Sequence, residues 1–295
     1  VYTASYDLTV RLSQIFKEQV IGKPQSFSVS TSQVNRIMCT DDRKIILAIN
    51  PYILIYDAPN RGKLIQLTGH STNVNDVICV NGNYFSCSED RTWQFWDPRQ
   101  RTRSLKCCNT SSALNSIQID SSQNYLITSN EKGQIEAWDL RTSTLLCSKK
   151  LSEQPIRSSA VSKNNIIVSG CQDKYVRINS FNGTEFEEIT SFQAHDDIIL
   201  RTLISPDEKY FITTSADSSS KLWSMEDYTL KYHLTDEKQT EWVWDASFTK
   251  DSKYVVTGGT DKTYRTWEIE TGKMIYSNSD AHTKGITALC TFEQI

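Results

Sequence analysis

Short apolar segments that end in an aromatic residue recur along the chain. In the three strongest copies, small residues and an aspartate precede the segment: SEDRTWQFW at 88–96, SADSSSKLW at 215–223 and GTDKTYRTW at 259–267. Weaker copies are SYDLTVRLS at 5–13, CQDKYVRIN at 171–179, ILIYD at 53–57 and IEAWD at 135–139. Apolar runs of this length between turn residues predict β-strands throughout.

The final aromatic residue of each copy, or the residue that replaces it, lies at position 13, 56, 96, 138, 179, 223 or 267, so successive copies are 40–44 residues apart. A period of about 40–45 residues, with four strands in each unit, is typical of WD repeats. The seven end positions define six whole intervals, and residues 1–13 together with those after Trp267 make a seventh repeat divided between the termini. We therefore expect an all-β fold, a seven-bladed WD-repeat β-propeller formed as a single domain by residues 1–295. Its ring should be closed by strands from both termini, with 286–292 joining the N-terminal strands.

A second pattern predicts the inner strands that line the central channel, whereas outer strands are segments such as 63–67. The inner strands begin at Val34, Val74, Leu114, Ile156, Leu200, Val243 and Ile286. The next residues, Asn35, Asn75, Asn115, Arg157, Arg201, Trp244 and Thr287, should surround one mouth of the channel. Lys132, in a turn between strands, is expected on the opposite face.

Trp242 and Trp244 stand out at this mouth because they lie two residues apart in a strand and so point to the same side. Tryptophan is enriched in binding hot spots, which favours a partner site, although a core role stays open. Their blade is separated from that of Gln33 and Asn35 only by the closing blade. We expect these four residues, with Asn75 and Thr287, to form one patch.

Three of the four histidines precede inner strands and predict a buried hydrogen-bond network in their blades. We expect His70 to bond Asp90, with Trp96 joined through Ser86 or Ser88. The second set is His195, Asp217 and Trp223, joined through Thr213 or Ser215, while His282 should reach Asp7 across the ring closure. A His–Asp–Ser set can also be catalytic, but repetition at the repeat spacing favours a structural role. His233 is expected in a loop.

Composition excludes several classes of protein. The net charge is −3 without a cluster of Lys and Arg, so we expect no nucleic-acid partner. The longest apolar run, 45–56, is shorter than the roughly 20 residues that cross a bilayer, so no integral membrane segment is expected. The eight cysteines contain no CxxC pair, and we interpret most of them as small buried residues in a reducing compartment. GxSxG, P-loop, GxGxxG and HExxH motifs are absent, so we expect no catalytic residue, metal or cofactor.

Several phrases carry a resemblance to a known family. They are SYDLTVR at 5–11, QVN at 33–35, IYD at 55–57, AH at 194–195, SPD at 205–207 and SADSSSKLW at 215–223. The most specific is WVWDASFTKDSKYVVT at 242–257, because a generic WD repeat has no reason to carry two tryptophans there. In these phrases, and over its whole length, the chain resembles the small WD-repeat subunit of TOR kinase complexes, a family also called G-protein β-subunit-like.

The resemblance implies a non-catalytic scaffold that binds and stabilises a TOR-type kinase domain in nutrient and growth signalling. It implies a contact between a helical insertion in the C-terminal lobe of that domain and Gln33, Asn35, Trp242 and Trp244 of this chain. Accessory subunits of the complex are candidate further partners. The expected location is the cytoplasm, peripherally at endomembranes through the kinase complex.

Two other functions compete with this one. The first is a generic WD scaffold of another assembly, such as a ubiquitin-ligase receptor or a trafficking factor. The second is an enzyme that uses the channel as its active site, which would need converging acids or metal ligands at the mouth. The QVN and WVW phrases favour the TOR-complex subunit, and the amides, arginines and tryptophans predicted at the mouth count against the enzyme.

Overall fold

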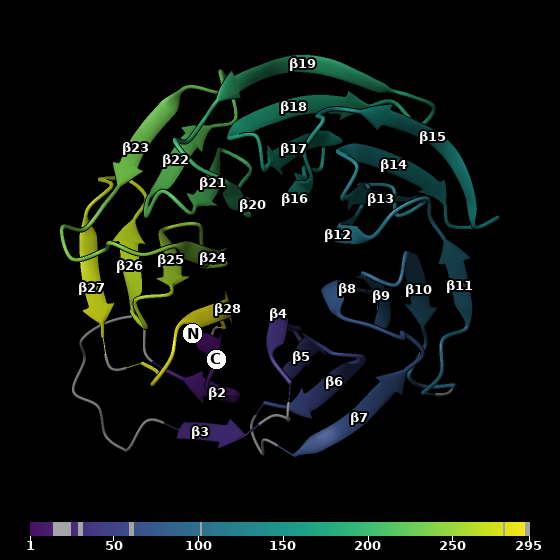
Figure 1. Cartoon of the computed structure of the whole chain (residues 1–295), viewed down its shortest axis with the longest axis horizontal. Helices are drawn as coiled ribbons and strands as arrows, with labels where there is room; N and C mark the ends of the chain where they lie inside the picture. Colours follow the sequence, from purple (N-terminus) through teal and green to yellow (C-terminus); the bar gives the residue numbers. More distant parts are fainter. Residues whose placement is uncertain (14–24, 29–31, 59–61, 101, 280, 293–295) are drawn as a thin grey trace.

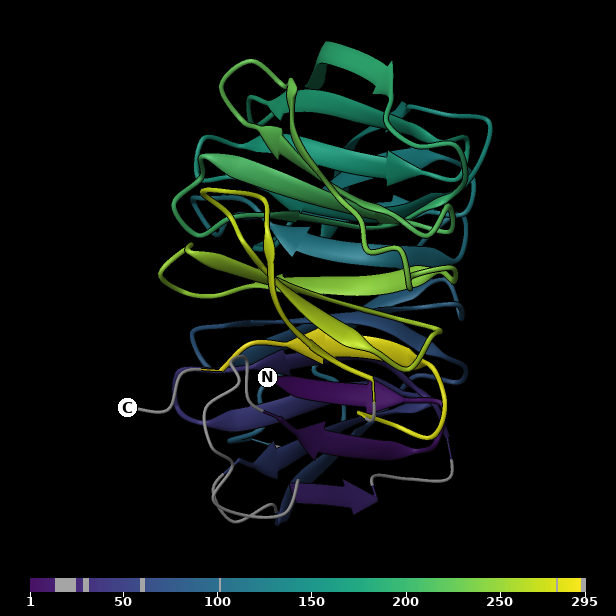
Figure 2. The same cartoon turned by 90° about the vertical axis from the view of Figure 1, so that its left-hand side faces the viewer.

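The computed structural model describes residues 1–13, 25–28, 32–58, 62–100, 102–279 and 281–292. These residues form 28 strands in seven four-stranded antiparallel sheets, and no helix occurs among them. The sheets are arranged as blades around a common centre (Figure 1), and the disc is seen edge-on in Figure 2. The prediction of a seven-bladed β-propeller is confirmed.

Each blade is written from its inner to its outer strand. Blade 1 contains β28 (Ile286–Cys290), β1 (Tyr2–Ser5), β2 (Thr9–Leu12) and β3 (Gln25–Ser28); blade 2 contains β4 (Val34–Cys39), β5 (Lys44–Ile49), β6 (Tyr52–Asp57) and β7 (Lys63–Thr68). Blade 3 contains β8 (Val74–Val80), β9 (Asn83–Ser88), β10 (Thr92–Trp96) and β11 (Lys106–Asn109); blade 4 contains β12 (Leu114–Ile119), β13 (Tyr125–Asn130), β14 (Gln134–Asp139) and β15 (Thr144–Lys150). Blade 5 contains β16 (Ile156–Val161), β17 (Ile166–Cys171), β18 (Tyr175–Phe181) and β19 (Phe186–Gln193); blade 6 contains β20 (Ile199–Ile204), β21 (Tyr210–Ser215), β22 (Ser220–Ser224) and β23 (Leu230–Leu234). Blade 7 contains β24 (Val243–Phe248), β25 (Tyr254–Gly259), β26 (Tyr264–Glu268) and β27 (Met274–Asn278).

Blade 1 closes the ring as predicted, because it combines strands from both ends of the chain. The strand β28 pairs antiparallel with β1, with Tyr2 opposite Cys290 and Ala4 opposite Ala288. The strand is shorter than the predicted segment 286–292, since it ends at Cys290. Closure of this kind leaves no blade with an unprotected inner edge.

The core lies between neighbouring blades rather than at one centre. Ile46 and Ile53 of blade 2, for example, pack in one buried cluster with Val77, Tyr84 and Trp96 of blade 3. In blades 2 and 3, for example, the second and third strands are mostly buried along both faces, whereas the outer strand is largely exposed. This explains why the strands inside a blade are more easily recognised in the sequence than the outer ones.

Each inner strand begins with a β-bulge. In β4, Val34 pairs with Ile49 and Arg36 with Ala48, so Asn35 is left out of the ladder. The same irregularity occurs at the start of the inner strands of the other six blades. A bulge re-aims the side chains next to it, and the second residue of each inner strand here faces the channel mouth.

The predicted start of the inner strand in blade 6 is wrong by one residue. The strand β20 begins at Ile199, and its bulge lies between Ile199 and Arg201. Leu200 therefore occupies the mouth position that had been expected for Arg201. The sequence does not show which residue begins the strand, because each of the three consecutive apolar residues 198–200 fits that position.

Candidate partner-binding site

All five residues predicted to bind a partner line one cavity of about 300 Å³ at the channel mouth where the inner strands begin. We call this end of the channel the tryptophan mouth. Its lining consists of Gln33, Asn35, Arg36, Asn75, Glu89, Asn115, Glu131, Arg157, Ile198, Leu200, Arg201, Trp242, Trp244, Asp245 and Thr287. The structure thus brings the five residues together from blades 2, 3 and 7, and also adds several that the sequence did not indicate.

The two tryptophans lie side by side, with ring centroids 5.4 Å apart and planes inclined by 55°. Trp244 Nε1 donates a hydrogen bond to Thr260 Oγ1 at 3.0 Å, and the Thr260 amide donates to the Trp242 carbonyl at 2.9 Å. Gly259 permits this arrangement, since a Cβ there would lie 2.3 Å from the Trp242 carbonyl oxygen. Trp242 is 41% exposed, so it is not a core residue.

Ile198 and Leu200 of blade 6 extend the apolar surface beside the tryptophans. Sequence reasoning missed both because of the error in the register of β20. A signal that would have found them is the distance from each histidine to the first inner-strand residue. That distance is four residues for His70 and Val74 and for His282 and Ile286, and it places the start of β20 four residues after His195.

The second inner-strand residues on the other side of the mouth tie one blade to the next. Asn35 Nδ2 donates to the carbonyl of Val74 at 3.0 Å, and Asn75 Nδ2 donates to that of Leu114 at 2.8 Å. Asn115 and Thr287 make the corresponding bonds to Ile156 and Val34, at 3.0 and 2.8 Å. These four bonds join blades 1 to 5 in order, so Asn35 and Asn75 have a structural role besides the predicted one.

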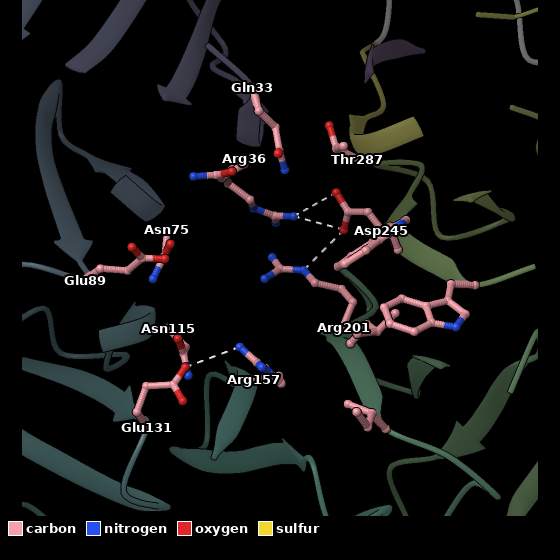
Figure 3. Close-up of a pocket in the computed structure, with 15 residues that line it drawn as sticks. Gln33, Arg36, Asn75, Glu89, Asn115, Glu131, Arg157, Arg201, Asp245 and Thr287 are labelled. Atoms are coloured by element: carbon pink, nitrogen blue, oxygen red, sulfur yellow. Dashed lines mark hydrogen bonds and ion pairs between the residues drawn. The ribbon is translucent and has the colours of Figure 1, made fainter. Parts of the chain in front are cut away.

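Charged side chains complete the polar side of the mouth. Glu131 pairs with Arg157 at 3.2 Å, and Asn73 Nδ2 donates to Glu89 at 3.0 Å. Figure 3 shows Glu89 and Glu131 at the edge nearest Asn75 and Asn115. The mouth is therefore apolar over blades 6 and 7 and carries amides and carboxylates over blades 2 to 4.

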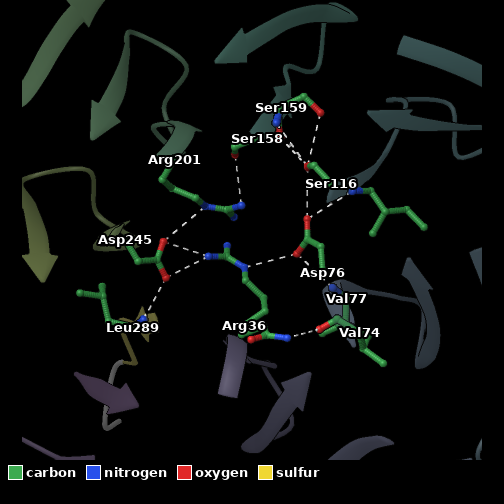
Figure 4. A network of polar contacts seen from close by, with 12 residues as sticks. Arg36, Val74, Asp76, Val77, Ser116, Ser158, Ser159, Arg201, Asp245 and Leu289 are labelled. Carbon is green, nitrogen blue, oxygen red and sulfur yellow. Dashed lines mark hydrogen bonds and ion pairs between the residues drawn. The ribbon is translucent and has the colours of Figure 1, made fainter. Parts of the chain in front are cut away.

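A buried cluster of four charges forms the floor of the tryptophan mouth (Figure 4). The Arg36 guanidinium bonds both carboxylate oxygens of Asp245 at 3.0 Å and lies 3.4 Å from Asp76. Arg201 lies 3.4 Å from Asp245 and donates to Ser158 Oγ at 3.2 Å. Burial alone would lower the pKa of Arg36, but the two carboxylates raise it, so the guanidinium stays charged.

This cluster does not resemble the acids of a channel active site. Asp76 and Asp245 each accept backbone N–H groups of a neighbouring blade, from Ile117 at 3.2 Å and Leu289 at 2.9 Å. Both carboxylates also form ion pairs with Arg36, and Asp245 forms a second one with Arg201. Their contacts therefore join neighbouring blades. Within the described residues, no group of three or more His, Cys, Asp or Glu side chains is placed to hold a metal ion.

The predicted histidine networks are present as hydrogen bonds inside blades 3 and 6. His70 Nδ1 bonds Asp90 at 2.8 Å and Nε2 bonds Ser86, which also accepts from Trp96 Nε1 at 2.8 Å. In blade 6 the corresponding residues are His195, Asp217, Thr213 and Trp223, with distances of 2.7 to 2.9 Å. Both histidine side chains are fully buried, so no substrate in solution can reach the rings.

The same aspartate is paired with a histidine in blade 1 and with an arginine in blades 5 and 7. In blade 1, His282 reaches Asp7 at 3.1 Å across the ring closure and its Nε2 bonds Thr3. In blades 5 and 7 an arginine of the third strand replaces the histidine: Arg177 pairs with Asp173 at 2.6 Å, and Arg265 pairs with Asp261 at 2.8 Å. The turn aspartate thus always has a partner, as a partly buried carboxylate requires.

The pKa shifts of Asp217 and Asp7 have the same kind of origin. Burial alone would raise the pKa of Asp217, but hydrogen bonds and the charge of His195, with a bond from Ser219, lower it below its ordinary value. In blade 1, burial is likewise outweighed by bonds from Thr9 and Thr283 and by His282, so the pKa of Asp7 falls to about 2. The folded state therefore favours the carboxylate form of both groups.

Two further predictions are wrong. Lys132 does not lie on the opposite face: it follows Glu131 in the turn between β13 and β14, and its Nζ donates to the Ser111 carbonyl at 3.2 Å. A turn between the second and third strands lies at the end where the first strand begins, because adjacent strands are antiparallel. His233 lies not in a loop but in the outer strand β23, opposite Lys221. The strand reads LKYHL, and this alternation of apolar and polar residues is typical of a strand with one face toward solvent, so the sequence did carry the signal.

Comparison with known proteins gives consistent results. The model of the WD domain, G-beta repeat family matches residues 62–97, 186–224 and 228–268. The chain is 32% identical to Protein LST8 homolog of Drosophila pseudoobscura pseudoobscura, with 99% of this chain and 96% of that protein covered. It is 30% identical to Target of rapamycin complex subunit wat1 of Schizosaccharomyces pombe, over 76% of this chain and 74% of the relative. It is also 33% identical to Non-functional target of rapamycin complex subunit LST8-2 of Arabidopsis thaliana, over 84% and 82%.

Proposed function

This chain belongs to the LST8 family of WD-repeat subunits of target of rapamycin complexes, and from that premise we propose that it is a non-catalytic scaffold that binds and stabilises a TOR-type kinase domain. One relative carries the name of a non-functional subunit, so membership of the family does not by itself assign the role. The argument for this chain therefore rests on the surface that its own residues form.

The observation that carries the proposal is the exposed tryptophan pair at the tryptophan mouth. Trp242 is exposed over 41% of its surface and lies against Trp244, with Ile198 and Leu200 lining the same cavity. Adjacent apolar side chains that a soluble fold leaves uncovered mark interaction sites, and tryptophan dominates the energy of many such sites. Trp244 is already fixed by Thr260, so a partner does not have to order that ring.

The two sides of the mouth fit a helix that is apolar along one face. Such a helix, here the proposed insertion in the C-terminal lobe of the kinase domain, would place its apolar residues over blades 6 and 7. Its polar flank would face Gln33, the side-chain amides of Asn35 and Asn75, and the carboxylates of Glu89 and Glu131. Basic or amide side chains on that flank match this chemistry.

The test is co-purification of the kinase with the double variant Trp242→Ala and Trp244→Ala. Hot-spot truncations typically cost about 2 kcal/mol or more, so binding should weaken roughly thirtyfold or more while the propeller stays folded. Circular dichroism and a thermal melt check the fold. The matched control is Leu145→Ala with Leu146→Ala, which removes two comparably exposed apolar side chains from β15 on the rim.

If the tryptophan variant folds and keeps wild-type affinity, the site assignment is wrong. If wild-type chain purified from cells brings a ubiquitin ligase or a trafficking assembly and no TOR kinase, the generic scaffold is the better function. Turnover that survives repurification and is lost with a single substitution at the mouth would establish an enzyme instead. We also propose accessory TOR-complex subunits as partners and a cytoplasmic location, at endomembranes when kinase-bound, which cell fractionation with and without the kinase would test.

No helix long and apolar enough to cross a membrane occurs in the described part of the chain.

A further inference from the structure

The opposite end of the channel, where the inner strands finish, has a different chemistry. A cavity of about 240 Å³ is lined there mainly by apolar and sulfur-containing side chains: Ile37, Met38, Cys39, Leu203, Ile204, Phe248, Leu289 and Cys290. We call this end the thiol mouth. None of the five residues proposed to bind the kinase lines it.

Two cysteines meet at the thiol mouth from distant parts of the sequence. Cys39 is the last residue of β4 in blade 2, and Cys290 is the last residue of β28 in blade 1. Their Sγ atoms lie 2.8 Å apart, although the residues are separated by 251 positions. A disulfide bond is about 2.05 Å long, so a small adjustment of the two side chains would complete one.

We propose that Cys39 and Cys290 are a site of reversible oxidation to an intramolecular disulfide that fastens the ring closure. Among the described strands, blade 1 alone combines both ends of the chain, and β28 joins it through hydrogen bonds to β1. A covalent bond between β28 and β4 would link the last strand of the propeller to the blade that follows the closure. Cross-links that span long stretches of chain restrict the unfolded state most, so this bond should stabilise the folded ring.

The two thiols have different surroundings, which assigns their roles. Cys290 is only 7% exposed, whereas Cys39 is partly exposed at the thiol mouth. Burial raises the pKa of the Cys290 thiol well above its ordinary value, so this thiol stays protonated. Cys39 is therefore the thiol that meets an oxidant first, and Cys290 is the one that resolves the product.

The oxidant we assign is a hydroperoxide, with hydrogen peroxide as the simplest case. The Cys39 thiolate attacks one peroxide oxygen, the O–O bond breaks, and the second oxygen leaves as hydroxide, which takes up a proton to become water. This leaves a sulfenic acid on Cys39. The Cys290 sulfur then attacks Cys39 Sγ, the S–S bond forms, the S–O bond breaks, and the Cys290 proton leaves with the hydroxyl as water. A dithiol reductant reverses the step by thiol–disulfide exchange.

Peptide mapping of the wild-type chain after treatment with hydrogen peroxide tests the pairing directly. Trypsin releases Cys39 in the peptide 37–43 and Cys290 in the peptide that starts at residue 285. We expect these two peptides as one disulfide-linked species, lost on treatment with dithiothreitol. The oxidised chain should also melt several degrees higher than the reduced chain under non-reducing conditions.

The controls separate this pair from the adjacent Cys107 and Cys108 of β11. Cys107→Ser with Cys108→Ser should keep the linked species and the rise in melting temperature, and adding Cys39→Ser should abolish both. Peroxide that converts Cys39 to a sulfinic acid while Cys290 stays a free thiol would overturn the proposal. So would a linked species that involves only other cysteines, or one that forms without any change in melting temperature. The wild-type mapping needs no variant to fold, and none of these outcomes depends on kinase binding.

Discussion

Blades 3 and 7 lie on the two sides of the tryptophan mouth and use the same repeat positions differently. In blade 3, His70 and Asp90 bond inside the blade, and Asn75 ties it to blade 4. In blade 7, Gln239 stands at the histidine position, Arg265 forms an ion pair with Asp261 from within the sheet, and Trp244 replaces the asparagine. Blade 3 uses these polar residues for hydrogen bonds within the ring, whereas blade 7 places two indole rings at the mouth.

The comparison shows how a repeat can acquire a binding surface without losing its fold. The turn aspartate of blade 7 is satisfied by Arg265, a residue that is itself 3% exposed, so the loop before β24 no longer has to supply a histidine. Gly259 and Thr260, which replace Ser88 and Glu89 of blade 3, make room for and anchor the tryptophans. Stability and recognition are thus carried by separate residues, which substitutions can test one by one.

The largest loss of stability should come from Arg265→Ala. Its guanidinium lies 2.9 Å from Asp236 and 2.8 Å from Asp261, so its removal leaves two largely buried carboxylates without their cation. Breaking a buried ion pair by removing one partner costs about 3 kcal/mol or more. Urea denaturation would measure the change. A cost below that of Asp90→Ala would mean that Arg265 does not replace the histidine network.

Asp90→Ala in blade 3 and Asp217→Ala in blade 6 should each lower the free energy of unfolding by roughly 1–3 kcal/mol. Each leaves a buried histidine nitrogen without its carboxylate. The surface change Lys238→Ala is the control and should stay within about 0.5 kcal/mol of wild type. Equal thermal melts for all three variants would contradict the structural role of the networks.

Asn75→Ala tests the division between the two sides of the mouth most directly. It removes one bond between blades, to the Leu114 carbonyl, and should cost about 1 kcal/mol of stability. Kinase binding by the folded variant should weaken only about fivefold, because a single amide contact worth about 1 kcal/mol is lost. Trp242→Ala should do the reverse, with an unchanged melt and lost binding. If Asn75→Ala instead weakened binding as strongly as Trp242→Ala, both sides of the mouth would contribute to recognition.

The smallest effect is a difference in acid response between blade 1, which has a histidine, and blade 7, which has an arginine. Burial lowers the pKa of His282 from its ordinary value of 6.5, although Asp7 opposes the change. At a pH between the lowered pKa of His282 in the folded chain and its pKa of about 6.5 in the unfolded chain, the unfolded chain binds more protons. The free energy of unfolding should therefore fall as the pH drops below 6.5. Asp7, whose pKa is about 2 against 3.8, adds a second loss as the pH falls from 3.8 through 2.

His282→Gln should flatten the slope of unfolding free energy between pH 7 and pH 5, measured by urea denaturation at each pH. Arg265→Lys in blade 7 serves as the comparison, because lysine keeps its charge over that interval and the slope should not change. An unaltered slope in His282→Gln would show that His282 does not titrate differently in the folded and unfolded chain.

The repeat period and the strand pattern were enough to predict the number of blades, the ring closure and the positions of the histidine networks. Most of these features depend on residues within one repeat, where the alternation of apolar residues and the turn residues act locally, and the ring closure follows from counting the repeats. The same pattern placed Trp242, Trp244, Gln33, Asn35 and Asn75 at one mouth, because equivalent positions in a propeller lie at equivalent heights. It failed in blade 6, because the three consecutive apolar residues 198–200 do not show which of them begins the inner strand.

Only the tertiary structure decided which residues of different blades meet. Arg36 reaches Asp245 across 209 positions of sequence, Cys39 reaches Cys290 across 251, and Asn75 uses the carbonyl of Leu114 in the next blade. Such contacts depend on how the blades are inclined and on where each bulge turns a side chain. No local pattern records them, because the partners belong to different repeats and their side chains meet only after the blades have packed together.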